Sequence, residues 1–261
     1  MTPRELLDHY DEATLWPAGS GLDLPLAYQQ ALAVRDLRIA RGEKPRGFKV
    51  GFTNRGIWPR YNVFAPIWGT VWNTTLSFCE AQGEVSLAGM CQPRLEPEAV
   101  FGMAATPPAG ASLDQLRACV EWIAPGFEIV QTHQPGWKFQ APDTVADGGL
   151  HGRLLVGRRV PVAQVAADAG VFDQRLAGCR LTLHRGDEQV DEGRGANVLD
   201  GPLHALRYFL DALRECPGAP DLQPGDVVTT GTWTDAWPVA PGERWAARFE
   251  APLSTLEVRF T

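Results

Sequence analysis

The sequence predicts an α+β protein that is mostly β and carries a helical cap at its N-terminus. Apolar residues recur at helical spacing in residues 2–41, whereas most of the later chain alternates short apolar segments with turns rich in glycine and proline. The 261 residues contain no internal repeat and no low-complexity linker, and they can bury a sizeable core. We therefore expect a single unit in which residues 1–45 form the cap and residues 46–261 form the main β domain.

The composition excludes several classes of protein. The formal net charge is −7 and no basic run occurs, so a nucleic-acid-binding surface is not expected. No stretch approaches the length of a membrane span, and the first residues do not resemble a signal peptide. Five widely spaced cysteines without a CxxC motif indicate reduced thiols in a cytoplasmic protein. Five scattered histidines, none at ligand spacing, argue against a zinc site.

Two amphipathic helices make up the predicted cap. The first spans about residues 2–15, and a loop rich in glycine and proline follows at residues 16–21. The second runs from about residue 24 to residue 41, where Gly42 ends it.

The middle of the chain is expected to form strands interrupted by a long loop. Residues 56–79 are rich in Trp, Pro and Asn, and we expect them to be irregular. The expected elements around this loop are a strand at 46–53, strands within 85–103, a short helix at 112–119 with Ser112 as its N-cap, and a loop from residue 121 that enters an apolar strand ending at residue 130.

The last part of the chain is expected to alternate turns and strands around one helix. Residues 131–140 read as a polar loop. The expected elements after it are strands at 153–156 and 160–161, a hairpin of 179–183 and 189–194 turned at 185–187, a helix at 201–213, and strands at 225–229, 231–233 and 256–260.

Two glutamates, Glu96 and Glu98, stand two residues apart in an extended segment. Side chains alternate faces along a strand, so both carboxylates point to the same side. Such a pair is unfavourable unless a positive group lies between the charges, and Mg²⁺ or Ca²⁺ prefers carboxylate oxygens. The alternative is a solvated pair on an exposed strand. Pro97 lacks an N–H group, which predicts an edge, a bulge or a strand start rather than a central position.

Glu128 and Lys49 are two further charged residues in unusual surroundings. Glu128 lies in an apolar segment, so it either faces water on an edge strand or is buried and paired. The chain has only three lysines against 21 arginines, so a lysine outside a plain loop is a candidate for a role that needs its compact ammonium or its tunable pKa. Lys49 and Lys138 are these candidates, whereas Lys44 is expected in a solvated loop.

Several segments carry a resemblance to a known family. In order, they are Gly47–Thr53 for a G-x-K-x-G-x-T strand, Pro93–Glu98 for an E-x-E metal strand, Pro125–Ile129 for a third carboxylate, Val145–Asp147 for an A-D-N loop, and Gly225–Gly231 with Pro241-Gly242 for a C-terminal turn. On these segments the sequence resembles the hydratase and decarboxylase branch of the fumarylacetoacetate hydrolase superfamily. The match spans most of the chain, from Gly47 to Phe260.

The resemblance implies a mixed β-sandwich roll that forms a homo-oligomer, with residues 46–261 as its catalytic domain. One Mg²⁺ or Mn²⁺ would be held by Glu96, Glu98 and Glu128, and a small 2-keto or 2-hydroxydienoic acid would chelate it through its carboxylate and 2-oxo oxygen. The implied activity is hydration of a 2-hydroxydienoate of the 2-keto-4-pentenoate type, through a metal-chelated enolate, in the breakdown of aromatic compounds. The resemblance implies Lys49 and Asp147 as catalytic residues, and Phe48, Leu95, Gly231, Thr232 and Lys138 as substrate-binding residues.

Some positions depart from the family's pattern. Gly148 stands where Asn usually follows the A-D pair, and Gln131-Thr132-His133 stands where Asp-Ser-Arg is common. These departures leave open a catalytically degenerate member that only binds a small molecule. A 4-oxalocrotonate-type decarboxylase needs the same chelated enolate and is a second alternative. A C–C hydrolase ranks lower, because no histidine precedes the E-x-E strand within the main domain.

Tryptophans flank several of the motif segments. They predict a pocket that is more aromatic than usual and that accepts a bulkier or more apolar substrate tail. The residues concerned are Trp58, Trp68, Trp72, Trp137 and Trp233.

Overall fold

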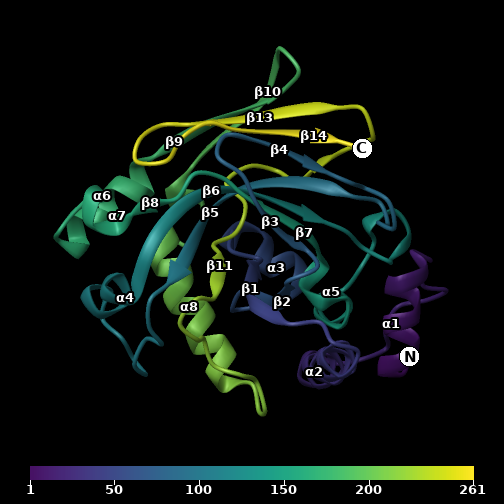
Figure 1. Cartoon of the computed structure of the whole chain (residues 1–261). Helices are drawn as coiled ribbons and strands as arrows, with labels where there is room; N and C mark the ends of the chain where they lie inside the picture. The colour runs from purple at the N-terminus through teal and green to yellow at the C-terminus, as the bar shows by residue number, and fades with distance from the viewer.

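Two β-sheets and a helical cap make up the computed structural model, which describes residues 1–261 (Figure 1). The larger sheet contains β1 (Pro45–Gly51), β2 (Ile67–Trp72), β3 (Leu76–Phe78), β5 (Arg94–Met103), β6 (Val120–Val130), β7 (His151–Val156), β8 (Val160–Pro161), β11 (Val227–Thr229) and β12 (Trp237–Pro238). The smaller sheet, at the top of Figure 1, contains β4 (Gln82–Val85), β9 (Arg180–Arg185), β10 (Glu188–Arg194), β13 (Arg244–Phe249) and β14 (Leu256–Phe260).

Both sheets are mixed. The nine-stranded sheet has the order β2-β1-β11-β5-β6-β7-β3, with β12 beside β5 and β8 beside β6. Its β1–β11 and β3–β7 pairs are parallel. The five-stranded sheet has the order β10-β9-β13-β14-β4, with β14 and β4 parallel. The predicted α+β fold, mostly β, is confirmed.

The helices lie in the cap and around the sheets (Figure 1). None of them is both long enough and apolar enough to cross a membrane. They are α1 (Pro3–Glu12), α2 (Leu24–Ala40), α3 (Trp58–Tyr61), α4 (Leu113–Cys119), α5 (Ala141–Ala146), α6 (Val162–Val165), α7 (Ala169–Gly178) and α8 (Pro202–Glu215), with 3₁₀ turns η1 (Arg55–Ile57), η2 (Pro135–Trp137), η3 (Gly148–Leu150) and η4 (Gly195–Asn197).

The cap, α1 and α2, packs against the edge of the large sheet at the lower right of Figure 1. Thr2 and Glu5 form a capping box at the start of α1, since each side chain accepts a hydrogen bond from the other residue's backbone N–H. Leu6 of α1 and Ala27 of α2 share a buried apolar cluster with Ile67 of β2 and with α5. The cap is thereby joined to the sheet by apolar packing.

One large core of 42 buried residues joins the two sheets and α8. Leu95 of β5, Trp245 of β13 and Phe209 of α8 all belong to it. Successive residues of a strand face opposite sides, so Glu96 and Glu98 point away from this core. The charged residues of β5 therefore share the other face of the large sheet.

The prediction that residues 56–79 are irregular is wrong for the second half of this segment, where β2 and β3 form. β2 pairs antiparallel with β1, with Lys49 opposite Gly69. Trp68 and Trp72 are buried strand residues with 3% of their surface exposed, although tryptophans in this segment favoured a loop in the sequence. Large aromatic residues fit well on a buried strand, and here this outweighs the nearby proline and asparagine.

Two prolines lie inside central strands. β6 runs without interruption through Pro125, where a loop was expected. Pro97 lies in the middle of β5 rather than at an edge, a bulge or a strand start. Its carbonyl accepts a hydrogen bond from the N–H of Trp233, between the points where β11 and β12 pair with β5. On that side of β5, neither β11 nor β12 pairs with position 97. The N–H and C=O of one strand residue point to the same side, so the N–H that Pro97 lacks would have faced this unpaired position.

The last half of the chain differs from the expectation in several places, and α5, α6, β12 and β13 are elements that were not expected. No strand forms at residues 231–233, since the N–H groups of Gly231 and Trp233 bond to Glu98 and Pro97 instead. Helix α7, for which no element was expected, begins after its N-cap Asp168. The predicted hairpin of β9 and β10 and the predicted helix α8 are confirmed.

Candidate active site

Three carboxylates meet on the face of the large sheet that points away from the core. Glu96 of β5 lies directly opposite Glu128 of β6, and Glu98 lies opposite Gly126. One oxygen from each of the three glutamates lies within 4.8 Å of the others. Glu98 and Glu128 are fully buried, whereas Glu96 is partly exposed. The two ligand candidates predicted on β5 and the third on β6 are therefore brought together.

Glu98 is held by the backbone that follows β11. Its Oε2 accepts hydrogen bonds from the N–H groups of Thr230 at 2.9 Å and Gly231 at 2.6 Å. Its Oε1 is buried and has no hydrogen-bond partner. Gly231 thus orients a carboxylate through its backbone, and the other oxygen of Glu98 is left for a ligand.

Glu128 is held by a histidine that the sequence analysis did not select. Its Oε1 lies 3.0 Å from Nδ1 of His151, whose Nε2 lies 2.8 Å from the hydroxyl of Thr75. Its Oε2 is buried without a hydrogen bond. His151 was missed because it is a single histidine at the start of β7, and only the pairing of β7 with β6 shows its neighbour.

Lys49 lies beside the carboxylates, on the face of β1 opposite to Phe48. Its Nζ is 3.3 Å from Oε2 of Glu128 and donates a hydrogen bond to the carbonyl of Gly149 at 2.7 Å. Burial opposes its charge, but the surrounding carboxylates, first of all Glu128, outweigh this and raise the pKa of Lys49. Lys49 is therefore a fixed cation at the site.

The carboxylates carry more negative charge than one lysine balances. Burial raises the pKa of Glu96 to about 7, and burial together with the charges of Glu128 and Glu96 raises the pKa of Glu98 well above its ordinary value. The buried Oε1 of Glu98, which has no partner, and the set of three carboxylates fit a hard divalent cation that prefers oxygen ligands. The residues present therefore fit the Mg²⁺ or Mn²⁺ expected from the sequence.

A cavity of about 460 Å³ opens beside this cluster. Lys49, Glu96, Gly149 and Thr232 all line it. The hydroxyl of Thr232 donates to the carbonyl of Thr234 at 3.0 Å, so it can donate to a substrate carboxylate only after giving up this bond.

Four residues predicted to contact substrate do not line this cavity, and Gly231, which holds Glu98, is one of them. Phe48 and Leu95 belong to the large core, because each occupies the strand face opposite to the neighbouring charged residue. Lys138 is exposed and is not part of the cavity wall, although its neighbours Trp137 and Phe139 are.

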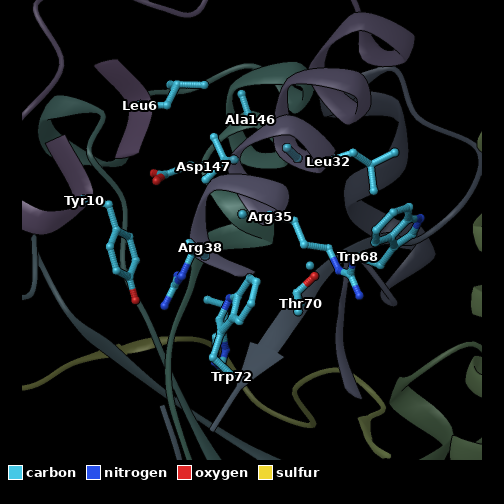
Figure 2. A pocket seen from close by; sticks show the side chains of 15 residues that line it. Leu6, Tyr10, Leu32, Arg35, Arg38, Trp68, Thr70, Trp72, Ala146 and Asp147 are labelled. Carbon is cyan, nitrogen blue, oxygen red and sulfur yellow. The ribbon is translucent and has the colours of Figure 1, made fainter. Parts of the chain in front are cut away.

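Asp147 also lies outside this cavity. Its carboxylate accepts hydrogen bonds from the backbone N–H of His133 at 2.9 Å and binds Nδ1 of the same residue at 2.6 Å. Asp147 contributes to a separate small cavity under the cap, and Figure 2 shows its carboxylate turned away from Arg35 and Arg38 there. Trp68 and Trp72 line this second cavity as well. Of the five tryptophans selected from the sequence, Trp137 and Trp233 line the cavity beside the carboxylates.

Similar proteins were found among enzymes of known activity, although no family model matches the chain. The chain is 28% identical over 236 residues to 2-hydroxyhexa-2,4-dienoate hydratase of Comamonas testosteroni, covering 90% of this chain and 85% of that one. It is 31% identical to 2-keto-4-pentenoate hydratase 1 of Dechloromonas aromatica strain RCB, covering 82% and 79%. It is 26% identical to 4-oxalocrotonate decarboxylase of Pseudomonas sp. strain CF600, covering 90% and 84%.

Solved structures share the fold. The 4-oxalocrotonate decarboxylase of Pseudomonas putida G7, complexed with magnesium and adipate, matches with a TM-score of 0.87 and 23% identity over 99% of this chain and 95% of that one. The fumarylpyruvate hydrolase of Pseudomonas aeruginosa, in complex with Mn²⁺ and pyruvate, matches with a TM-score of 0.57 and 17% identity over 83% and 89%.

The chain shares the fold of the fumarylacetoacetate hydrolase superfamily, as the sequence motifs predicted. Within it, the chain belongs to the branch of 2-keto-4-pentenoate hydratases and 4-oxalocrotonate decarboxylases.

Proposed function

We propose that this protein is a divalent-metal-dependent hydratase that adds water to a 2-hydroxydienoate of the 2-keto-4-pentenoate type. The observation that carries this proposal is the cluster of Glu96, Glu98 and Glu128 beside Lys49. Two members of this group, Glu96 and Lys49, line the cavity. Relatives that are 28–31% identical are named as hydratases of such acids. A bound Mg²⁺ or Mn²⁺ would take the carboxylate and 2-oxygen of the acid and stabilise negative charge on that oxygen.

The chain's own residues are assigned distinct roles. The three glutamates hold the cation, and Lys49 keeps a positive charge and a proton next to the substrate oxygen. Asp147 acts as a positioning residue: with His133 it holds the start of η3, whose Gly149 carbonyl binds Lys49. Gly231 orients Glu98 through its N–H.

We also propose that the protein is cytoplasmic and forms a homo-oligomer. Five free thiols favour the reducing cytoplasm. A homo-oligomer is favoured by Phe64, whose side chain is 81% exposed beside an apolar groove that includes Leu24 and Ile67.

The direct test is turnover of 2-hydroxypenta-2,4-dienoate and of a 2-hydroxymuconate-type diacid with Mg²⁺ or Mn²⁺, followed by ultraviolet absorbance and CO₂ release. Metal-dependent loss of the monoacid with formation of a hydroxylated 2-oxo acid supports the hydratase. Release of CO₂ from the diacid without hydration of the monoacid would favour the decarboxylase, the activity of relatives that are 26–28% identical. Inactivity on both acids with either metal would contradict the proposal.

A further inference from the structure

The cavity that Glu96 reaches has one continuous aromatic wall. The ring centroids of Phe52 and Tyr61 lie 4.8 Å apart, those of Tyr61 and Phe139 lie 5.7 Å apart, and those of Phe139 and Trp137 lie 5.9 Å apart. All four side chains line the cavity and are half-buried. Because Phe52, Tyr61 and Phe139 are stacked on one another, they offer a row of apolar ring edges to a bound group.

Other residues that line the cavity are acidic. Asp191, Glu192 and Asp235 all contribute to it. Asp191 is fixed by a hydrogen bond from Nε1 of Trp237 at 2.8 Å, whereas Glu192 and Asp235 are exposed and form no ion pair. A second carboxylate on a bound acid would therefore meet negative charge.

Arg60 is the one basic residue besides Lys49 that lines the cavity. It is exposed, lies 5.4 Å above the ring of Tyr61, and forms no ion pair. A single exposed ion pair contributes little to binding. Arg60 therefore does not outweigh three carboxylates, and the apolar wall decides which tail is bound.

We infer that this site selects a 2-oxo or 2-hydroxydienoic acid with an uncharged, planar tail and discriminates against a diacid. The inference rests on the proposed function for the position of the acid's head, which binds at the carboxylate cluster. The tail then extends along Phe52, Tyr61 and Phe139, because these stacked rings form the apolar part of the cavity wall.

The test measures binding apart from turnover. Three inert acids with the same head are titrated calorimetrically into the magnesium-loaded protein: 2-oxopentanoate, 2-oxo-5-phenylpentanoate and 2-oxohexanedioate. We expect the phenyl acid to bind at least about tenfold more tightly than 2-oxopentanoate, since an aromatic group gains apolar and stacking contacts. The diacid is expected to bind no more tightly than 2-oxopentanoate.

Two variants test whether the aromatic wall causes the preference for the phenyl acid. In Tyr61→Ala and in Phe139→Ala, the preference for the phenyl acid over 2-oxopentanoate should fall below about threefold, because the stack of rings is interrupted. Phe78→Ala is the matched control, since Phe78 is 51% exposed and lies outside the cavity. It should keep the full preference.

Three results would overturn the inference. They are equal binding of the phenyl acid and 2-oxopentanoate, binding of none of the three acids, and tighter binding of the diacid that Arg60→Gln abolishes. Each can occur while 2-hydroxypenta-2,4-dienoate is still hydrated, so a wrong tail assignment is distinguished from a wrong proposed function.

Discussion

Glu96 and Glu128 are direct register partners on the antiparallel strands β5 and β6. Like charges opposite each other destabilise a sheet, and the burial of Glu98 and Glu128 adds a cost of desolvation. Lys49 supplies one positive charge for three carboxylates. A divalent cation would balance the negative charge that Lys49 leaves uncompensated, so binding of such a cation should stabilise the fold.

Mg²⁺ or Mn²⁺ should stabilise the wild-type protein. At a hundredfold excess of the metal over its Kd, the free energy of unfolding should rise by about 2.7 kcal/mol. Glu96→Gln, Glu98→Gln and Glu128→Gln should each lose most of this gain in thermal unfolding with millimolar metal. Glu188→Gln, on the exposed hairpin of the small sheet, is the control and should retain it. A wild-type protein that binds neither metal would disprove the assignment of the cluster.

His151 should control how tightly the metal is held. Removing its contact to Oε1 of Glu128 frees that carboxylate to rotate, so we expect His151→Gln to weaken Mg²⁺ binding by about 10–100-fold. His184→Gln is matched to it, because His184 is also buried but lies on the small sheet. Isothermal titration of both variants with Mg²⁺ makes the comparison. Equal affinities would show that His151 does not orient the ligand.

Lys49→Met should separate catalysis from metal binding. The variant keeps a long side chain but loses the ammonium that lies beside the substrate, so kcat should fall by about 10²–10⁴-fold. Mg²⁺ binding should persist, since all three carboxylates remain and a competing cation is removed. Lys44→Met serves as the control outside the site. A kcat within a few-fold of wild type would show that Lys49 has only a structural role.

Gly231→Ala should damage both the fold and the site. Its φ is +93°, and an added Cβ would lie 1.8 Å from Oγ1 of Thr53. Gly225 has a similar φ of +87°, but an added Cβ would meet nothing within 4 Å. Gly225→Ala therefore measures the cost of a positive φ without a steric clash. We expect Gly225→Ala to cost about 1–2 kcal/mol and Gly231→Ala about 3–5 kcal/mol. Urea unfolding of the two variants tests this, and equal losses would contradict the steric argument.

The ion pair between Arg38 of α2 and Glu43 should make the free energy of unfolding depend on pH. Glu43 accepts hydrogen bonds from Arg38 and from the hydroxyl of Thr74 at 2.7 Å. Arg38 itself lies between the rings of Tyr10 and Trp72, 4.6 and 4.4 Å from their centroids (Figure 2). Burial alone would raise the pKa of Glu43, but the hydrogen bonds from Arg38 and Thr74 lower it to about 2.

The sign of this effect follows from proton binding. Below its ordinary pKa near 4.5, Glu43 binds more protons in the unfolded chain than in the folded one, so its contribution is complete above pH 4.5 and is lost as the pH falls towards 2. Allowing for partial screening by water, we expect about 2 kcal/mol. Urea unfolding of wild type and Glu43→Gln at pH 6 and pH 3 measures it. A stability difference that does not shrink between these two values would refute the prediction.

Local patterns were sufficient for part of the site. Alternation along a strand places Glu96 and Glu98 on one face, and the same rule separates Lys49 from Phe48. This rule also argues against Phe48 and Leu95 as contacts, since each adjoins a charged residue chosen for the site. The resemblance supplied these two positions without regard to the face on which they lie.

Residue periodicity was enough to predict the class of fold and the helical cap, and a motif within one strand was enough to predict Glu96 and Glu98 as a pair. Glu128 as the third ligand came from the resemblance, because it lies on another strand. The neighbours of these residues follow only from the packing of the folded chain. His151 meets Glu128, His133 holds Asp147, and Tyr61 joins Phe52 and Phe139 in one wall. These contacts join segments that are far apart in the chain or set at angles that no local pattern specifies, so they depend on how the sheets, loops and cap pack together.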